Sequence, residues 1–235
     1  MNRKIGIFDS GIGGTTTLKE IMKLLTKEYY IYYADSINNP YGNKSDEELF
    51  NITSNIVDYL IKNDVKLIVI ACNTATTRCI SKLRSIYPNM IFVGTEPAIK
   101  VACDNGYKNT LVLATPGTIS SKRTKELIDN NKKETENFYL VSCEGLANAI
   151  ENNKTNKVDK LLEYYLTPYL DKNIDSIVLG CTHYPLIKEK IQKYFKNASI
   201  LDGNIGVAKR VKYLLEENNL LNDKGNSNIK FIKSI

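Results

Sequence analysis

The sequence predicts an α/β protein of two similar domains related by pseudo-symmetry, each with a parallel sheet, and with the active site in the cleft between them. Short apolar runs alternate with helical patterns along the chain, and this alternation is typical of parallel sheets covered by helices. Residues at the ends of three predicted strands recur 106, 108 and 109 residues later: Asp9 and Thr115, Asp35 and Cys143, and Cys72 and Cys181. Such near-equal separations indicate an internal duplication.

The first half of the chain contains four short apolar runs bounded by glycine, proline or polar residues. These runs predict strands over 5–8, 30–34, 67–71 and 91–93. Apolar residues at helical spacing predict helices between them, over 15–25, 74–86 and 100–105. Ser45 is followed by three acidic residues, a combination typical of a helix N-terminus, so another helix is expected to begin there.

The second half repeats the pattern. Further strands are expected over 111–114, 138–142, 174–179 and 199–201, with a possible edge strand over 229–232. Helices should fill the gaps, including 158–170, which Pro168 should bend or end, and 207–217. We expect the first domain to comprise residues 1–95 plus 207–235 and the second to comprise residues 96–206.

Composition narrows the functional class. The 235 residues are 43% hydrophobic and 25% charged, which is ordinary for a soluble globular protein. No apolar run approaches the roughly 20 residues of a membrane span, and the start lacks a signal-peptide pattern, so a cytoplasmic protein without membrane association is expected. The net charge of +6 comes mainly from scattered lysines rather than one basic face, which argues against nucleic-acid binding. Five cysteines without a C-x-x-C pair, and a single histidine, make a metal site unlikely.

Two cysteines stand out because polar residues surround them at the ends of predicted strands. Cys72 is followed by Asn73 and Thr74, and Cys181 is followed by Thr182 and His183. Ligands of open α/β sheets bind at this carboxyl edge, and a helix beginning there can favour a thiolate. His183 can exchange a proton with Cys181, and Asp9 at another strand end can serve Cys72. The other three cysteines are interpreted as small buried hydrophobic residues.

Two opposed thiols are compatible with three kinds of chemistry. A disulfide redox pair generally needs close sequence spacing or a dedicated fold. A thiol nucleophile with His183 as its base would leave the second cysteine without a role. Two-base proton transfer needs two matched groups on opposite faces of a substrate, and a duplicated fold supplies them. The pairing of Cys72 with Cys181 therefore indicates racemisation.

Groups near the thiols can hold a small amino acid. Asn73, Thr74 and Thr182 offer donors that suit a carboxylate. Ser10 and the glycine-rich loop 11–14 form a further anion-binding turn, but this loop matches neither a dinucleotide fingerprint nor a Walker loop. Residues 40–42, Pro-Tyr-Gly, would place a rigid turn and backbone amides over the ligand.

The chain resembles the cofactor-independent glutamate racemases of bacteria. The matching segments are 5–14 (IGIFDSGIGG), 33–36 (YADS), 40–42 (PYG), 71–75 (ACNTA), 96–97 (EP), 114–118 (ATPGT) and 179–186 (LGCTHYPL). The resemblance implies interconversion of L- and D-glutamate, with the D form entering peptidoglycan synthesis. It implies no pyridoxal phosphate, metal or nucleotide, two α/β domains, and association as a homodimer.

The resemblance also assigns roles by position. Cys72 and Cys181 correspond to the two acid/base residues, and Asp9 and His183 to their assisting partners. Substrate contacts are implied for six further residues: Ser10, Tyr41, Gly42, Asn73, Thr74 and Thr182.

Residues 143–151, CEGLANAIE, depart from the family pattern. They keep Cys143, and Glu151 stands where the family has a glutamate, but they lack the usual proline and gain Glu144, a carboxylate that could disfavour a dicarboxylate substrate or point to solvent. Three alternatives therefore stay open: an aspartate racemase, a Cys–His hydrolase, and a non-catalytic amino-acid sensor. His183 favours glutamate over aspartate, because an acid is typical at that position of the aspartate enzymes.

Overall fold

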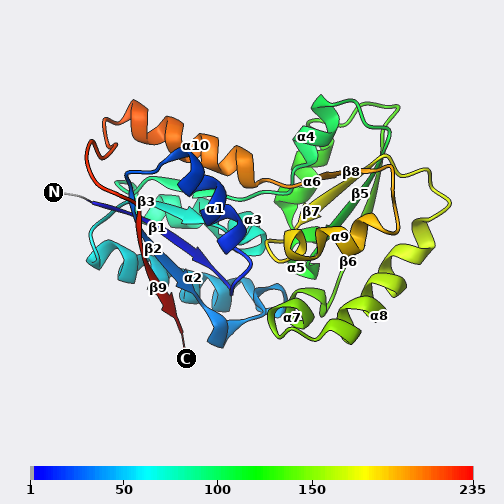
Figure 1. Ribbon diagram of the computed structural model, residues 1–235, viewed down its shortest axis with the longest axis horizontal. Helices are drawn as coiled ribbons and strands as arrows, with labels where there is room; N and C mark the ends of the chain where they lie inside the picture. The colour runs from blue at the N-terminus through cyan, green and yellow to red at the C-terminus, as the bar shows by residue number, and fades with distance from the viewer. Residues whose placement is uncertain (1–2, 235) are drawn as a thin grey trace.

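A five-stranded parallel sheet forms the core of the first half of the molecule. The computed structural model describes residues 3–234 and shows two halves, with both ends of the described chain in the first (Figure 1). The strand order is β4-β3-β1-β2-β9. The bounds are β1 Lys4–Asp9, β2 Tyr29–Ala34, β3 Val65–Ile70, β4 Phe92–Gly94 and β9 Asn228–Lys233. The predicted edge strand near the end of the chain is therefore confirmed, and it pairs with β2.

A four-stranded parallel sheet forms the core of the second half, in the order β6-β5-β7-β8. Its strands are β5 Asn109–Ala114, β6 Asn137–Ser142, β7 Ser176–Gly180 and β8 Ser199–Leu201. If β5 to β8 are matched in turn with β1 to β4, the strand orders of the two sheets are the same. The predicted fold of two similar parallel-sheet α/β domains is thus confirmed.

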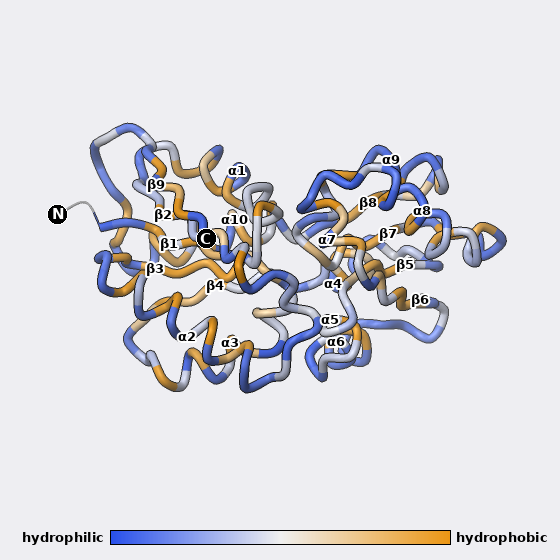
Figure 2. The backbone as a smooth tube through the Cα atoms, turned by 90° about the horizontal axis from the view of Figure 1, so that it is seen from below, coloured by the Kyte–Doolittle hydropathy of each residue, from blue (hydrophilic) through white to orange (hydrophobic). Residues whose placement is uncertain are grey.

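Helices cover both faces of the first sheet. One face packs against α1 (Thr15–Leu24) and α10 (Asn204–Glu217), and the other against α2 (Asp46–Lys62) and α3 (Asn73–Ile86). All six residues of β3 are buried, as expected for a central strand covered on both faces. Figure 2 shows the hydrophobic segments along the strands of this sheet and hydrophilic segments in the outer loops.

The second sheet is covered in the same way. One face packs against α7 (Leu146–Glu151), α8 (Thr155–Leu166) and α9 (Lys188–Gln192), and the other against α4 (Ile99–Asp104) and α6 (Lys122–Asp129). The remaining helix, α5, is the short Pro116–Ile119. The predicted helix over 158–170 ends at Leu166, and Pro168 lies in the short 3₁₀ turn η3 (Thr167–Tyr169) that follows. None of the helices within residues 3–234 has the length and apolar character needed to cross a membrane.

The chain crosses between the halves twice, after β4 and after β8. The second crossing returns it to α10, which packs against α1, and then to β9. This arrangement brings the carboxyl ends of β1 and β3 close to that of β7, because Asp9 at the end of β1 contacts Thr182 just beyond β7. Residues predicted to act together therefore meet where the halves meet.

Candidate active site

Cys72 lies just beyond β3 and caps the N-terminus of α3. Its side chain is buried, and the backbone N–H groups of Thr74 and Ala75 point toward the sulfur. Burial nevertheless raises the pKa of the Cys72 thiol well above its usual range, and the nearby negative charge of Asp9 raises it further. The helix N-terminus therefore does not make Cys72 a thiolate, and at neutral pH it is a neutral thiol.

Cys181 follows β7 at the equivalent position of the second sheet. An α-helix was expected to begin after Cys181. The element that follows is instead the 3₁₀ turn η4 (Tyr184–Ile187). The polar partner of Cys181 is instead His183, whose Nδ1 lies 3.9 Å from the sulfur. The predicted contact between Cys181 and the only histidine is present.

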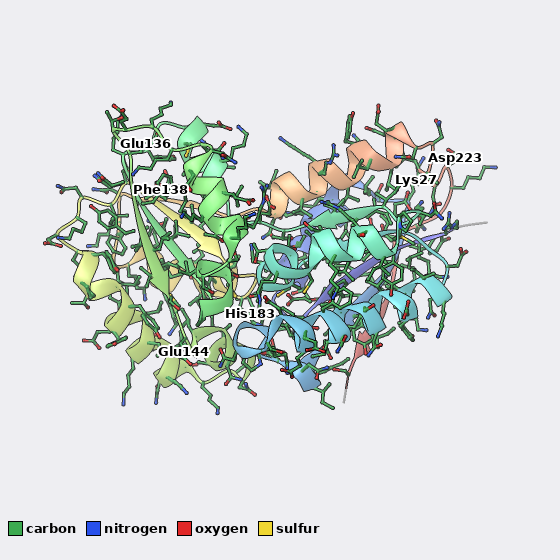
Figure 3. All side chains as sticks on the ribbon, turned by 180° about the vertical axis from the view of Figure 1, so that it is seen from behind. Lys27, Glu136, Phe138, Glu144, His183 and Asp223 are labelled. Carbon is green, nitrogen blue, oxygen red and sulfur yellow. The ribbon has the colours of Figure 1, made fainter. Side chains whose placement is uncertain are left out.

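His183 connects Cys181 with Glu151, a residue of α7. The imidazole Nε2 lies 2.6 Å from Oε2 of Glu151 and donates to it. Burial alone would lower the pKa of His183, but the contacts with Cys181 and Glu151 outweigh burial and raise it to about 10. His183 is therefore an imidazolium at neutral pH, with one N–H directed at Cys181 and the other at a carboxylate. In Figure 3, His183 lies where the two halves meet.

Asp9 joins the two halves at the end of β1. Its carboxylate accepts the backbone N–H of Gly14 at 2.9 Å and the hydroxyl of Thr182 at 3.2 Å. Burial raises the pKa of Asp9, although the positive charge of His183 acts in the opposite direction. Asp9 therefore positions the glycine-rich loop against Thr182 and adds negative charge near Cys72.

A small cavity lies between the thiols. Its wall contains nine of the ten residues predicted for the site, all except Asp9: Ser10, Tyr41, Gly42, Cys72, Asn73, Thr74, Cys181, Thr182 and His183. The cavity has a volume of only about 20 Å³, which is room for about one water molecule. The structure therefore represents a closed state, and an amino acid can enter only if the surrounding residues move apart.

Four polar residues of the site were not predicted. Glu151 holds His183, and Asp35 accepts the Tyr41 hydroxyl at 2.7 Å. Thr115 and Thr118 belong to the second half, and both contact the Thr74 hydroxyl, at 2.8 and 3.1 Å. The sequence pattern marks Asp35 and Thr115 only as strand ends. Their position at the same sheet edge as the cysteines was the signal that could have found them.

Glu144 lies outside the closed cavity. It is exposed and borders a neighbouring hollow of about 190 Å³ that shares Pro40, Gly42, Thr115 and Ala147 with the cavity wall. Its place in the second half, apart from His183, is visible in Figure 3. Of the two possibilities for Glu144 in residues 143–151, the structure shows the exposed carboxylate.

Comparison with known proteins gives one consistent relationship. Residues 16–210 match the family model described as Asp/Glu/Hydantoin racemase. A glutamate racemase of Clostridium botulinum is 42% identical over 94% of this chain and 87% of its own length. Crystal structures of glutamate racemases from Bacillus anthracis and, with D-glutamate bound, from Francisella tularensis superpose with TM-scores of 0.88 and 0.86. They are 28% and 33% identical, covering 99% and 100% of this chain and 89% of each structure. The chain belongs to the Asp/Glu/hydantoin racemase family.

Proposed function

We propose that this protein is a glutamate racemase that interconverts L- and D-glutamate by two-base proton transfer at the α-carbon. The observation that carries the proposal is the pair of buried thiols, Cys72 and Cys181, at equivalent strand ends on the wall of one cavity. The relatives at about 40% identity are named glutamate racemases, which favours glutamate over aspartate.

The two thiols have different surroundings, and in each direction of the reaction one acts as the base and the other as the acid. The His183 imidazolium lies against Cys181, whereas Cys72 has no such cation beside it within residues 3–234 and its pKa is raised by burial. The Cys181 thiolate removes the α-proton, and the electron pair of the C–H bond stays on the α-carbon. The Cys72 thiol then delivers its proton to the opposite face, so the configuration inverts and one thiol and one thiolate have exchanged roles. Catalysis in the other direction starts with Cys72 as the thiolate and Cys181 as the thiol.

The remaining polar groups bind substrate and stabilise the carbanionic transition state. Asn73, Thr74 and Thr182 lie beside the thiols and offer donors to the carboxylate at the reacting carbon, and Ser10, Tyr41 and Gly42 line the rest of the wall. A closed cavity that excludes bulk water strengthens these hydrogen bonds as charge develops on the substrate. Glutamate enters by separation of the two halves and is enclosed when they return.

We further propose the domain division 1–95 plus 207–235 and 96–206, a homodimer, and a cytoplasmic location in which the D-glutamate product supplies peptidoglycan synthesis. The five cysteines are free thiols, a state typical of a reducing compartment. Light scattering after size exclusion measures the mass of the assembly, and the mass of a single chain would contradict the dimer.

Closure of the halves makes Gly13 a sensitive position. A Cβ at Gly13 would lie 2.6 Å from His183 Nδ1 and 2.8 Å from the backbone nitrogen of the same residue. Gly13→Ala should therefore hold the halves apart and lower kcat/KM by about 100-fold. Gly206→Ala is the matched control, because a Cβ there meets no atom within 4 Å. An unchanged kcat/KM in Gly13→Ala would contradict this account of closure.

The proposed function is tested by incubating the protein with L-glutamate in D₂O without added cofactor. Loss of optical rotation together with α-deuteration is the expected result. Exchange with aspartate but not glutamate would indicate an aspartate racemase. Binding of an amino acid without exchange would indicate a sensor, and an activity that survives Cys72→Ala would favour the Cys–His hydrolase.

A further inference from the structure

Asn39 places an unused hydrogen-bond donor at the wall of the cavity between the thiols. The residue lines the same cavity as Cys72 and Cys181. Its side-chain Nδ2 is inaccessible to solvent and has no hydrogen-bond partner within residues 3–234. Buried polar groups are nearly always paired, so an unpaired amide beside a ligand cavity indicates a partner that arrives with the ligand.

Hydrogen bonds fix the loop that carries Asn39, both before and after this residue. The backbone N–H of Asn39 donates to the carbonyl of Ser36 at 3.3 Å. Asp35 accepts the hydroxyl of Tyr41 at 2.7 Å and that of Ser234, beyond the end of β9, at 2.9 Å. The amide of Asn39 is therefore presented by a fixed loop, and its orientation costs little when a ligand binds.

Several of the neighbouring side-chain donors are already engaged. The Tyr41 hydroxyl is bound to Asp35, the Nε2 of His183 to Glu151, and the Thr74 hydroxyl to Thr115 and Thr118. An amide N–H₂ donates only, so the group it receives must be an acceptor. A carboxylate oxygen is the strongest acceptor that an amino-acid substrate offers.

A dicarboxylate substrate needs two separate sets of donors. Asn73 and Thr74 begin α3 directly after Cys72, so the backbone N–H groups of this helix N-terminus suit the carboxylate attached to the reacting carbon. Asn39 belongs to a different loop of the same wall, and with Ser10 it is available to the second carboxylate. We propose that Asn39 Nδ2 donates to the side-chain carboxylate of the substrate and so contributes to the selection of glutamate; this inference rests on the proposed function.

The test compares Asn39→Ala and the nearly isosteric Asn39→Asp with Asn43→Ala, a change at an exposed asparagine of the same loop. Asn39→Ala should raise the KM for glutamate about tenfold and change kcat little, because a hydrogen bond to a charged group is lost. Asn39→Asp should raise KM further, since a carboxylate would then face a carboxylate. Asn43→Ala should leave KM unchanged.

Thermal unfolding with and without D-glutamate separates binding from folding. Both Asn39 variants should show a smaller rise in Tm on adding D-glutamate than the unsubstituted protein. A KM within about twofold of the unsubstituted value in both variants would overturn the inference, as would a lower Tm with an unchanged response to D-glutamate. If the unsubstituted protein does not racemise glutamate at all, the proposed function fails instead.

Discussion

Cys72→Ser and Cys181→Ser are each expected to reduce glutamate racemisation by at least about 1,000-fold, in both directions. A serine hydroxyl is a far weaker acid than a thiol. A serine at either position can therefore neither serve as the deprotonated base in one direction nor readily give up its proton in the other. Both sulfurs lie on the cavity wall, and the exchange of one atom should leave the packing of each half intact. Initial rates from L- and from D-glutamate, measured by optical rotation, give the two losses.

Cys79→Ala serves as the matched control for the cysteine variants. Cys79 is buried in α3, outside the cavity wall, and packs in the core on one face of the first sheet. Its loss should lower stability while leaving kcat/KM close to that of the unsubstituted protein. Full activity of either serine variant in one direction would contradict the two-base assignment.

Glu151→Gln is expected to lower kcat by about 10- to 100-fold near neutral pH and to move the alkaline limb of the pH–rate profile to lower pH. The carboxylate of Glu151 accepts from His183 and helps to raise the pKa of that imidazole to about 10. Without it the His183 pKa falls, so the imidazolium beside Cys181 is lost at lower pH. Profiles of kcat between about pH 6 and 11 measure the shift.

The ion pair between His183 and Glu151 also predicts that the free energy of unfolding depends on pH. The pKa of His183 is raised from 6.5 to about 10, so the folded state holds its proton more tightly than the unfolded chain does. The resulting stabilisation is fully present below pH 6.5 and is lost as the pH rises toward about 10. Glu151→Gln should flatten this dependence in urea unfolding, whereas Glu144→Gln, at an exposed carboxylate of the same stretch, should not. If the alkaline limb of the kcat profile were unchanged in Glu151→Gln, the proposed effect of Glu151 on the His183 pKa would be contradicted.

The positions of the strands and most of the cavity wall were predictable because both follow from local patterns. Apolar runs that end in a small residue and a polar group mark strand ends, and parallel strands bring these ends to one edge. The near-equal separations from Asp9 to Thr115 and from Cys72 to Cys181 correspond to the matching strand orders of the two sheets. No structure was needed to pair the two cysteines.

The unpredicted residues depend on packing between distant segments. Glu151 reaches His183 from a helix 32 positions earlier in the chain, and the family resemblance marks Glu151 without assigning it that contact. Thr118 contacts Thr74 only because the second half closes against the first. The pKa of Cys72 likewise depends on its burial in the closed molecule, which outweighs the helix N-terminus that the sequence indicated.

The central claim is that the proton removed from the substrate and the proton returned to it belong to different thiols. The most direct test is the isotope content of the first D-glutamate formed from L-glutamate in D₂O, measured by mass spectrometry at low conversion. Two-base transfer predicts product that carries deuterium at the α-carbon while the remaining L-glutamate still carries protium. D-Glutamate that retains the substrate's own α-hydrogen would show return of the proton by a single base and would contradict the account.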